Sequence, residues 1–342
     1  MEKYLKLLLT EIMPYEPTVE DSKSYLRNKV DYIFDKLNRK KFRRKKMGQE
    51  SLNNLIIKIQ ESIKKDSPIQ LVIPFGGYKH FWSASHPEPD WAELFQFRYI
   101  TEYVQPIAAL YKHGVTIEYV SEDLIVPRMD NYPDKAIEIY MKKFSEVLTW
   151  YQKQLSSNIH FTVSRVSSMC DKETLINEVL SKIPEKRKAF ELMSDTEKEK
   201  ELKRSHRSVF WKGKLDLSHL TEQEKLEKTI ESRLIELTFY ETESQPEYIG
   251  NYYGDNNRIC VVFSFGLSHD NAFDDLTLGS AHGSIAEFWI GRGVIEDPNN
   301  PHPRIITAKQ YEQLKEHIQT IPVDLSLEGK NYSKIEVVPL IN

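Results

Sequence analysis

IQLVIPFGG, residues 69–77, is a short apolar run rich in β-branched side chains that ends in two glycines. A run of this kind is typical of a buried strand that enters a loop. Residues 90–113 then place apolar side chains at the helical spacing of three and four, and Gly114 follows as a natural C-terminal cap. A second strand-like run, TIEYVSEDLIV, occupies 116–126. The order is therefore strand, loop, helix, strand.

The same alternation continues beyond the second strand. Residues 133–155 have the spacing of a helix, and NIHFTVSRV, residues 158–166, has the composition of a strand. Strands that are separated by helices pair in parallel, because the helix returns the chain to the same end of the sheet. Residues 69–166 thus predict an α/β fold with a mainly parallel sheet flanked by helices.

Helical patterns flank this region on both sides. Apolar residues recur at helical spacing in 19–46 and 50–65, and residues 171–241 have a charged helical pattern that we interpret as an insert. We expect a helical N-terminal segment, residues 1–68, and an α/β catalytic domain, residues 69–342, that contains the insert. No linker separates them, which slightly favours a single domain. The C-terminal part predicts strands at 258–267 and 283–294, a helix near 308–318, and short strands at 321–326 and 334–339.

Composition limits the classes of function. The chain has 47 basic and 51 acidic residues, and its net charge of -4 argues against a protein dominated by nucleic-acid binding. No run of about 18 apolar residues predicts a membrane span, and the N-terminal run Leu7–Leu9 is too short for a signal peptide. Only Cys170 and Cys260 are present, too few for a disulfide framework, so we expect a cytoplasmic protein.

One segment departs from this charge balance. In KLNRKKFRRKK, residues 36–46, eight of eleven residues are basic. The run is either a patch for phosphate or an acidic surface, or a solvated helix end. We favour the solvated helix end, because charge runs are usually solvated faces.

The loop after the first strand, GGYKHFWSASHPEPD at 76–90, is the main candidate for a ligand site. In doubly wound sheets ligands collect at the carboxyl ends of strands, and a loop of this length is usually functional. Lys79 and His80 can supply charge, and Ser85 can donate a hydrogen bond. A surface loop with its aromatic side chains folded under it is the alternative.

Asp90 and Glu93 precede the helical pattern with the spacing of a capping box, in which both side chains bind free backbone amides. A structural role is therefore at least as well supported as a catalytic one. The same helix start could also orient an anionic ligand, with Arg98 assisting.

Two adjacent carboxylates, Glu122 and Asp123, interrupt the second strand. Burying them costs free energy unless they meet a cation or bind a substrate. Arg128 is close in sequence and is expected to be that cation. Arg165 ends the next strand, where its guanidinium suits a carboxylate or phosphate. Solvation at a strand end is the alternative for the two acids.

Histidines and acids gather in the C-terminal half. His269 is adjacent to Asp270, and His282 precedes a predicted strand. Their spacing does not match the two-histidine, one-carboxylate pattern of non-haem iron, so we expect proton transfer or a simple hydrogen bond rather than a metal site. The sequence also lacks the glycine-rich nucleotide motifs, the paired-histidine zinc motif and the nucleophile elbow.

Two segments, IPFGGYKHFWSASHPEPDWAEL and IAALYKHGVTIEYVSEDLIV, resemble the isocyanide (isonitrile) synthases of the pyoverdine/dityrosine biosynthesis family. The family pattern has Phe-Pro at a strand end, a Lys-Ser-Pro-Asn loop, Pro-Asp-x-x-Glu at a helix start, Tyr-x-x-Gly, and Ser-Asp-Gly at the next strand end. The resemblance covers residues 73–126; the departures are Pro-Phe for Phe-Pro, a different loop sequence, and Ser-Glu-Asp for Ser-Asp-Gly. The matching positions, in the same order, are Pro74-Phe75, Lys79, Pro89 to Glu93, Tyr111 to Gly114, and Ser121 to Asp123.

The resemblance implies a Rossmann-like fold and a transferase or lyase of secondary-metabolite biosynthesis. Such an enzyme condenses the amine of an amino acid with the carbonyl of ribulose 5-phosphate and turns the amine into an isonitrile, without a metal or other cofactor. Its partners would be these small molecules and a downstream pathway enzyme, not a nucleic acid or a membrane. The implied roles are Lys79 and Arg98 for the sugar phosphate, Glu122 or Asp123 for the amino group, Arg165 or Arg128 for the carboxylate, His282 for proton transfer, and Phe75, Ser85 and Asp90 as further substrate contacts.

Two other functions stay open. One is a transferase or lyase that acts on an amino acid or a phosphorylated metabolite without forming an isonitrile, which the altered loop favours. The other is a non-enzymatic docking module built on segments 36–46 and 171–241. The polar loop and the aromatic-rich composition weigh mildly against the docking module.

Overall fold

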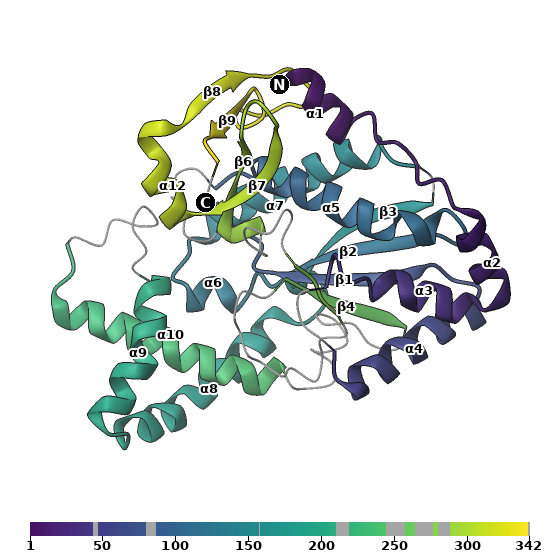
Figure 1. The fold of residues 1–342 in the computed structure, drawn as a ribbon. Helices are drawn as coiled ribbons and strands as arrows, with labels where there is room; N and C mark the ends of the chain where they lie inside the picture. Colours follow the sequence, from purple (N-terminus) through teal and green to yellow (C-terminus); the bar gives the residue numbers. More distant parts are fainter. Residues whose placement is uncertain are drawn as a thin grey trace.

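The computed structural model describes residues 1–43, 47–79, 87–156, 158–209, 219–243, 257–263, 276–279 and 288–340. Its centre is a sheet of five strands, namely β1 (Ile69–Phe75), β2 (Val115–Ser121), β3 (Ile159–Arg165), β4 (Arg258–Val262) and β5 (Leu276–Thr277). All of them pair in parallel in the order β3-β2-β1-β4-β5, of which Figure 1 labels β1 to β4. The predicted α/β fold with a mainly parallel sheet is confirmed.

Helices cover both faces of this sheet. Leu71 and Ile73 of β1 belong to the main core with α5 (Trp91–Ala108) and α7 (Asp134–Gln152). Val72 points to the opposite face, because side chains alternate along a strand. The region that we interpreted as an insert contains α8 (Lys172–Glu191), α9 (Asp195–Val209) and α10 (Glu222–Glu243). On this opposite face of the sheet, Val72 joins a second core with α8 and α10. No helix in the described ranges has the length and apolar composition needed to cross a membrane.

The N-terminal segment is helical, as its spacing predicts, but in shorter pieces. They are α1 (Glu2–Leu9), α2 (Val19–Arg27), α3 (Lys29–Leu37) and α4 (Gln49–Lys64). The helical pattern of 19–46 breaks at Asn28, whose side chain accepts hydrogen bonds from the amides of Val30 and Asp31. A capping asparagine starts a new helix because it satisfies amides that have no partner within the helix.

The C-terminal region forms a second sheet that the sequence patterns do not predict as a unit. Its strands are β6 (Gly291–Glu296), β7 (His302–Thr307), β8 (Gln319–Pro322) and β9 (Lys334–Val338), in the order β7-β6-β9-β8. Strand β7, which contains a proline, is an addition to the predicted elements. The helix expected near 308–318 is α12 (Ala308–Leu314), followed by the 3-10 turn η5 (Lys315–His317).

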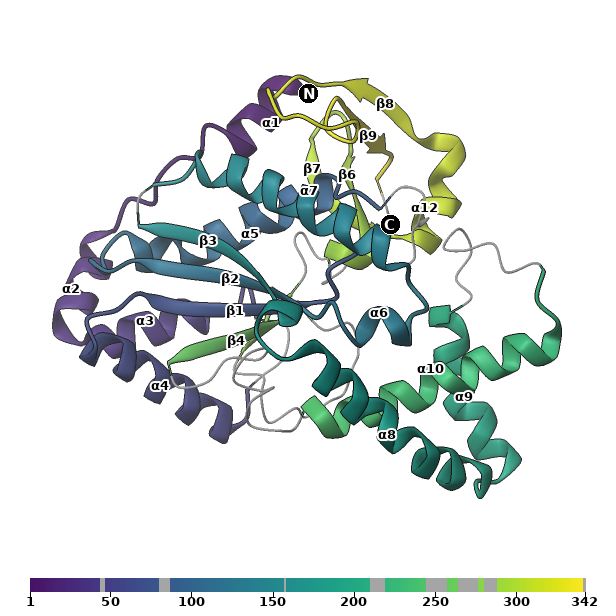
Figure 2. The same ribbon diagram turned by 180° about the vertical axis from the view of Figure 1, so that it is seen from behind.

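Helix α5 lies between the two sheets, which explains why most of its residues are buried. Phe97 packs edge-to-face on Tyr119 of β2, with ring centroids 5.4 Å apart. Trp91 packs in the same way on Tyr332 beside the second sheet, at 5.7 Å. Figures 1 and 2 show the second sheet on the far side of α5 and α7 from the parallel sheet. A helix in this position needs apolar residues around its whole circumference.

Candidate functional site

The ends of β1 and β2 meet closely at the carboxyl edge of the parallel sheet. This edge carries the ligand sites of doubly wound folds. Gly77 has a φ of 73°, and a Cβ atom there would lie 1.9 Å from Oγ of Ser121. Residue 77 therefore has to be glycine, and the turn after β1 packs directly on the end of β2.

Lys79 is buried just beyond this turn, at 1% exposure. Its ammonium group donates to the carbonyls of Phe288 and Gly291, both at 3.0 Å. It also forms ion pairs with Glu93 at 2.8 Å and Asp90 at 3.4 Å. An ammonium group has three hydrogens, and these four oxygens occupy all of them. We refer to Lys79, Asp90 and Glu93 below as the Lys79 cluster.

The predicted capping box at the start of α5 is confirmed, and it is part of this cluster. The Ala92 amide donates to Asp90, and the Asp90 amide donates to Glu93, both at 2.7 Å. Tyr140 of α7 donates its hydroxyl to the Glu93 carboxylate at 2.8 Å. Burial raises the pKa of Glu93 to about 7, although the charge of Lys79 opposes this shift.

A second cluster of charged side chains connects the ends of β2 and β3 to α7; its members are Asp123, Glu138 and Arg165. Arg165 donates from Nε to Asp123 at 2.6 Å and from its two terminal nitrogens to Glu138 at 2.8 and 2.5 Å. Asp123 also accepts from the amide and the hydroxyl of Ser167, at 3.0 and 2.6 Å. The hydrogen bonds between them raise the pKa of the Arg165 guanidinium and lower the pKa of the Glu138 carboxyl.

The expectation that Arg128 neutralises the acids after β2 is wrong for Asp123. Strand β3 pairs with β2 so that Arg165 lies opposite Ser121, and Arg165 therefore reaches Asp123 from the neighbouring strand. The Arg128 guanidinium instead donates to the carbonyl of Leu124 at 2.8 Å.

A cavity of about 320 Å³ lies beside the Asp123–Arg165 pair. We call it the edge cavity; its charged lining is Asp123, Asp134 and Glu138 on the acidic side and Arg128, Arg165 and Lys172 on the basic side. In the part of the chain that the structure describes, Arg128, Lys172 and Asp134 form no ion pair. The charge of Lys172 nevertheless acts on Glu138. A cavity lined by groups of both signs suits a zwitterion, because each charge of the ligand meets its opposite. Three residues singled out from the sequence, Asp123, Arg128 and Arg165, are thus brought together.

Lys79 and Arg98 are not brought together. Arg98 follows Glu93 by five residues, which is about 140° around an α-helix. Its charge acts on Tyr4 of α1 and on Tyr151 near the end of α7. Arg98 therefore occupies a different side of α5 from the Lys79 cluster.

Two other predicted site residues are buried. Glu122 is fully buried, and its carboxylate accepts from the amide of Ile125 at 3.0 and 3.1 Å. Phe75 is 1% exposed and packs on Phe144 and Phe288, with ring centroids 5.1 and 5.5 Å apart. Both side chains therefore pack in the interior at the carboxyl end of the sheet and are not exposed to solvent.

Ser85 and His282 lie outside the described residues, as do His80, His269 and Asp270. Their roles in substrate binding and proton transfer stay predictions. Among the described residues, no three His, Cys, Asp or Glu side chains are arranged to hold a metal ion.

The basic segment 36–46 makes contacts within the chain where it is described. Lys36 pairs with Asp21 and Lys41 pairs with Glu102, both at 2.6 Å. These contacts agree with the interpretation of the segment as a helix end whose charges are balanced by acidic neighbours.

Asp134, Glu138 and Lys172 line the edge cavity, but the sequence analysis did not single them out. Asp134 and Glu138 are spaced by four at the start of a helix, so they share a face. Two carboxylates with this spacing in the helix that follows a strand are a signal that could have been used. Lys172 has no such signal, because it opens a helix in which lysine is common.

Comparisons with known proteins bear on the fold. No protein-family model matches the chain, and no curated protein matches it. The structure is similar to the crystal structure of the PvcA protein from Pseudomonas aeruginosa, with a TM-score of 0.59 and 13% sequence identity. The similarity covers 91% of this chain and 99% of that chain. Because the match covers nearly the whole chain, the shared fold cannot consist of the parallel sheet alone.

Proposed function

We propose that the chain is an isocyanide synthase-like enzyme that joins the amine of an amino acid to ribulose 5-phosphate. We further propose that the edge cavity binds the amino acid. The observation that carries this proposal is the lining of the cavity, which includes Arg128, Lys172 and Asp134, none of which forms an ion pair among the described residues. An amino acid has one carboxylate and one ammonium group, which match these two kinds of side chain.

Each wall of the edge cavity has a role in this proposal. Arg128 and Lys172 bind the carboxylate, and Asp134 binds the amino group. Arg165 is held by Asp123 and Glu138, so it serves as a fixed wall of the cavity rather than as a free cation. Of the two residues that the resemblance implies for the carboxylate, this assignment keeps Arg128 and not Arg165, and it adds Lys172. It also moves the amino-group contact from Glu122 or Asp123 to Asp134.

Two likenesses support the class of enzyme. Residues 73–126 resemble the isocyanide synthases in the order of their motifs. The fold resembles PvcA over 91% of the chain. The proposed first step is attack of the unprotonated amine on the sugar carbonyl, with loss of one water molecule to give an imine. His282 is the proposed group for the proton transfers of this step.

A rival reaction in the same cavity has a specific observation in its favour. In the resemblance Lys79 binds the sugar phosphate, but its ammonium group is buried and its hydrogens are occupied. If Lys79 only positions the loop, the second substrate is not necessarily a sugar phosphate. The rival is a transferase or lyase that acts on an amino acid without isonitrile formation.

Binding and product analysis test the proposal together. Wild-type protein is titrated with tyrosine, tryptophan and other amino acids by calorimetry, alone and with ribulose 5-phosphate, and the mixtures are analysed by mass spectrometry. Asp134→Asn and Arg128→Gln should each weaken amino-acid binding about tenfold, because each removes a charge-assisted hydrogen bond. Glu146→Gln is the control, because Glu146 lies on the same helix and pairs with Lys143 at the surface.

The outcomes separate the alternatives. A product with the mass of an isonitrile supports the full proposal. Amino-acid binding that depends on Asp134 and Arg128, without this product, favours the rival. If no amino acid binds, or if both cavity variants bind like Glu146→Gln, the edge cavity is not the amino-acid site.

A further inference from the structure

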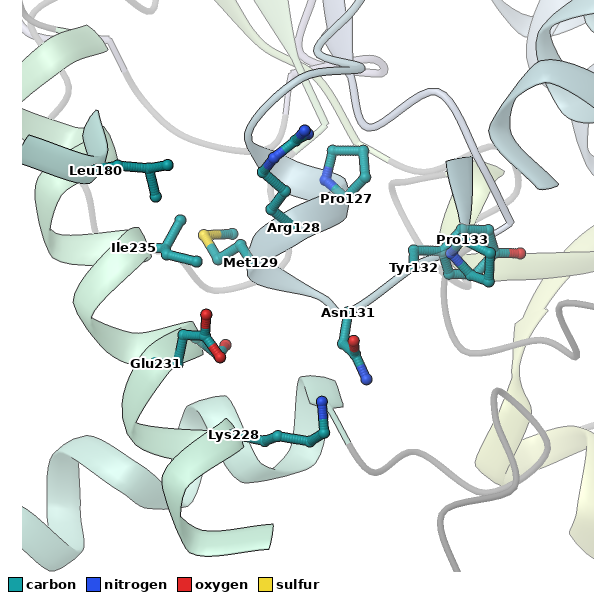
Figure 3. Close-up of a pocket in the computed structure, with 11 residues that line it drawn as sticks. Pro127, Arg128, Met129, Asn131, Tyr132, Pro133, Leu180, Lys228, Glu231 and Ile235 are labelled. Atoms are coloured by element: carbon teal, nitrogen blue, oxygen red, sulfur yellow. The ribbon is translucent and has the colours of Figure 1, made fainter. Parts of the chain in front are cut away.

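A second, larger cavity lies between the end of the sheet and the helical region that follows β3. It has a volume of about 510 Å³ and is formed by α6 (Val126–Met129), the residues after α6, α8 and α10 (Figure 3). We call it the helical cavity. Its volume is in the range of small-molecule sites, roughly 300 to 1,000 Å³.

One wall of the helical cavity is apolar and only partly covered by protein. Leu180 of α8, Met129 of α6 and Ile235 of α10 converge on it, as Figure 3 shows. Ile235 is 4% exposed, whereas Leu180 is 44% exposed. An apolar ligand that covered Leu180 would remove this surface from water, which favours binding.

The other wall has a lysine, Lys228, that makes no ion pair among the described residues. Lys228 belongs to α10, and in Figure 3 its ammonium group points toward the Asn131 amide. Glu224, one turn earlier, feels the charge of Lys228 but hydrogen-bonds to Thr221 instead. Glu231 lines the cavity one turn later and is also without an ion pair among the described residues.

Two other lysines on the same two helices are paired. Lys225 pairs with Glu222 at 2.7 Å, and Lys182 of α8 pairs with Glu178 at 3.2 Å. Within the described chain Lys228 lines the cavity without such an ion pair, and like Lys225 and Lys182 it is partly buried. An ammonium group in this position, beside an amide and opposite an apolar wall, is complementary to an anion attached to an apolar body.

We propose that the helical cavity is a binding site for a small carboxylate with an apolar acyl or aryl body. The carboxylate binds to Lys228 and Asn131, and the apolar body packs against Leu180, Met129 and Ile235. The site is distinct from the edge cavity, with which it shares Arg128. The inference does not rest on the proposed reaction, because Lys228 and the apolar wall have no part in it.

The probe for a test is 4-phenylbutyrate, with the uncharged 4-phenylbutanol as its matched analogue. Calorimetry on the full-length protein measures the affinity for both. We expect Lys228→Gln to weaken binding of 4-phenylbutyrate about tenfold and to leave binding of the alcohol nearly unchanged. Lys225→Gln is the matched control, because it removes the same charge from a paired lysine on the same helix.

A second measurement locates the probe. With ¹³C-labelled methyl groups, the resonances of Leu180 and Ile235 should shift during the titration, and Asp123→Asn should leave these shifts unchanged. Equal binding by Lys228→Gln and Lys225→Gln, absence of binding to the wild type at millimolar concentration, or unshifted methyl resonances would each overturn the proposal. Loss of amino-acid binding at the edge cavity has no effect on these results, so the two proposals fail independently.

Discussion

The Glu93 carboxyl is buried beside the Lys79 ammonium group, and its ionisation makes the stability of the fold depend on pH. Burial raises its pKa from 4.5 to about 7. The folded chain therefore keeps this proton up to about pH 7, whereas the unfolded chain loses it near its ordinary pKa. Between these values the folded state binds more protons, so the free energy of unfolding decreases as pH rises.

We predict that the free energy of unfolding falls by about 2 to 3 kcal/mol when the pH is raised from about 5 to about 8, because of the ionisation of Glu93. In Glu93→Gln this part of the pH dependence should be lost, because the amide does not titrate. Urea unfolding of both proteins at the two pH values measures the difference. The exposed variant Glu316→Gln should keep the wild-type dependence. The same pH dependence in Glu93→Gln and the wild type would contradict the prediction.

Among the elements, α5 and β6 approach so closely that a side chain at Gly293 does not fit. A Cβ atom there would lie 2.2 Å from the amide nitrogen of Ala92 and 2.4 Å from the carbonyl carbon of Trp91. The Gly293 amide donates to Asp90 at 3.1 Å, and the Trp91 indole donates to the carbonyl of Lys334 at 2.8 Å. The first turn of α5 is thus one of the places where the second sheet is fixed to the rest of the molecule.

Gly293→Ala should therefore reduce the free energy of unfolding by about 2 kcal/mol or more, because both clashing atoms are backbone atoms that cannot rotate away. Gly48→Ala is a suitable control, since a Cβ atom at Gly48 meets nothing within 4 Å. Urea denaturation followed by circular dichroism compares the two variants. The close packing of α5 on β6 is refuted if both variants unfold at the same urea concentration.

At the scale of the whole molecule, one hydrophobic core connects the N-terminal helices, the parallel sheet and the second sheet. Ile33 of α3, Leu71 of β1 and Ile335 of β9 all belong to it, and each is fully buried. Tyr32 of α3 donates its hydroxyl to the carbonyl of Pro106 in α5 at 2.8 Å. The N-terminal helical segment, residues 1–68, therefore shares its core with the sheets.

A shared core predicts one cooperative unfolding transition for all these parts. Ile33→Ala should lower the free energy of unfolding by about 3 kcal/mol, because it leaves a cavity in the core. The unfolding transitions followed by circular dichroism and by tryptophan fluorescence should shift together in this variant. Leu26→Ala, at an 81% exposed position of α2, should shift neither unfolding transition. Separate transitions for the two probes would show that the N-terminal helices fold as an independent unit.

Local patterns in the sequence were sufficient to predict the elements of the parallel sheet. Strands β1 and β3 and helix α7 agree with the predicted segments to within three residues, whereas β2 and α5 end five residues earlier than predicted. The C-terminal cap of α5 is Ala109, not Gly114 as the sequence pattern predicts. The capping box of Asp90 and Glu93 was also predicted correctly. Periodicity and capping depend on residues only a few positions apart, so they can be read from the chain itself.

The positions of the charged side chains depended on the tertiary structure. Asp123 pairs with Arg165, which is 42 residues away, and Lys79 reaches the carbonyls of Phe288 and Gly291, more than 200 residues away. The parallel pairing of β6 with β9, which makes the second sheet, is likewise a contact between distant segments. The sequence by itself thus determined which segments are strands and helices and where the sheet edge carries polar residues. Only the folded chain decided which charges meet there, because a charge is neutralised by whichever partner lies nearest in space, and local periodicity contains no information about that distance.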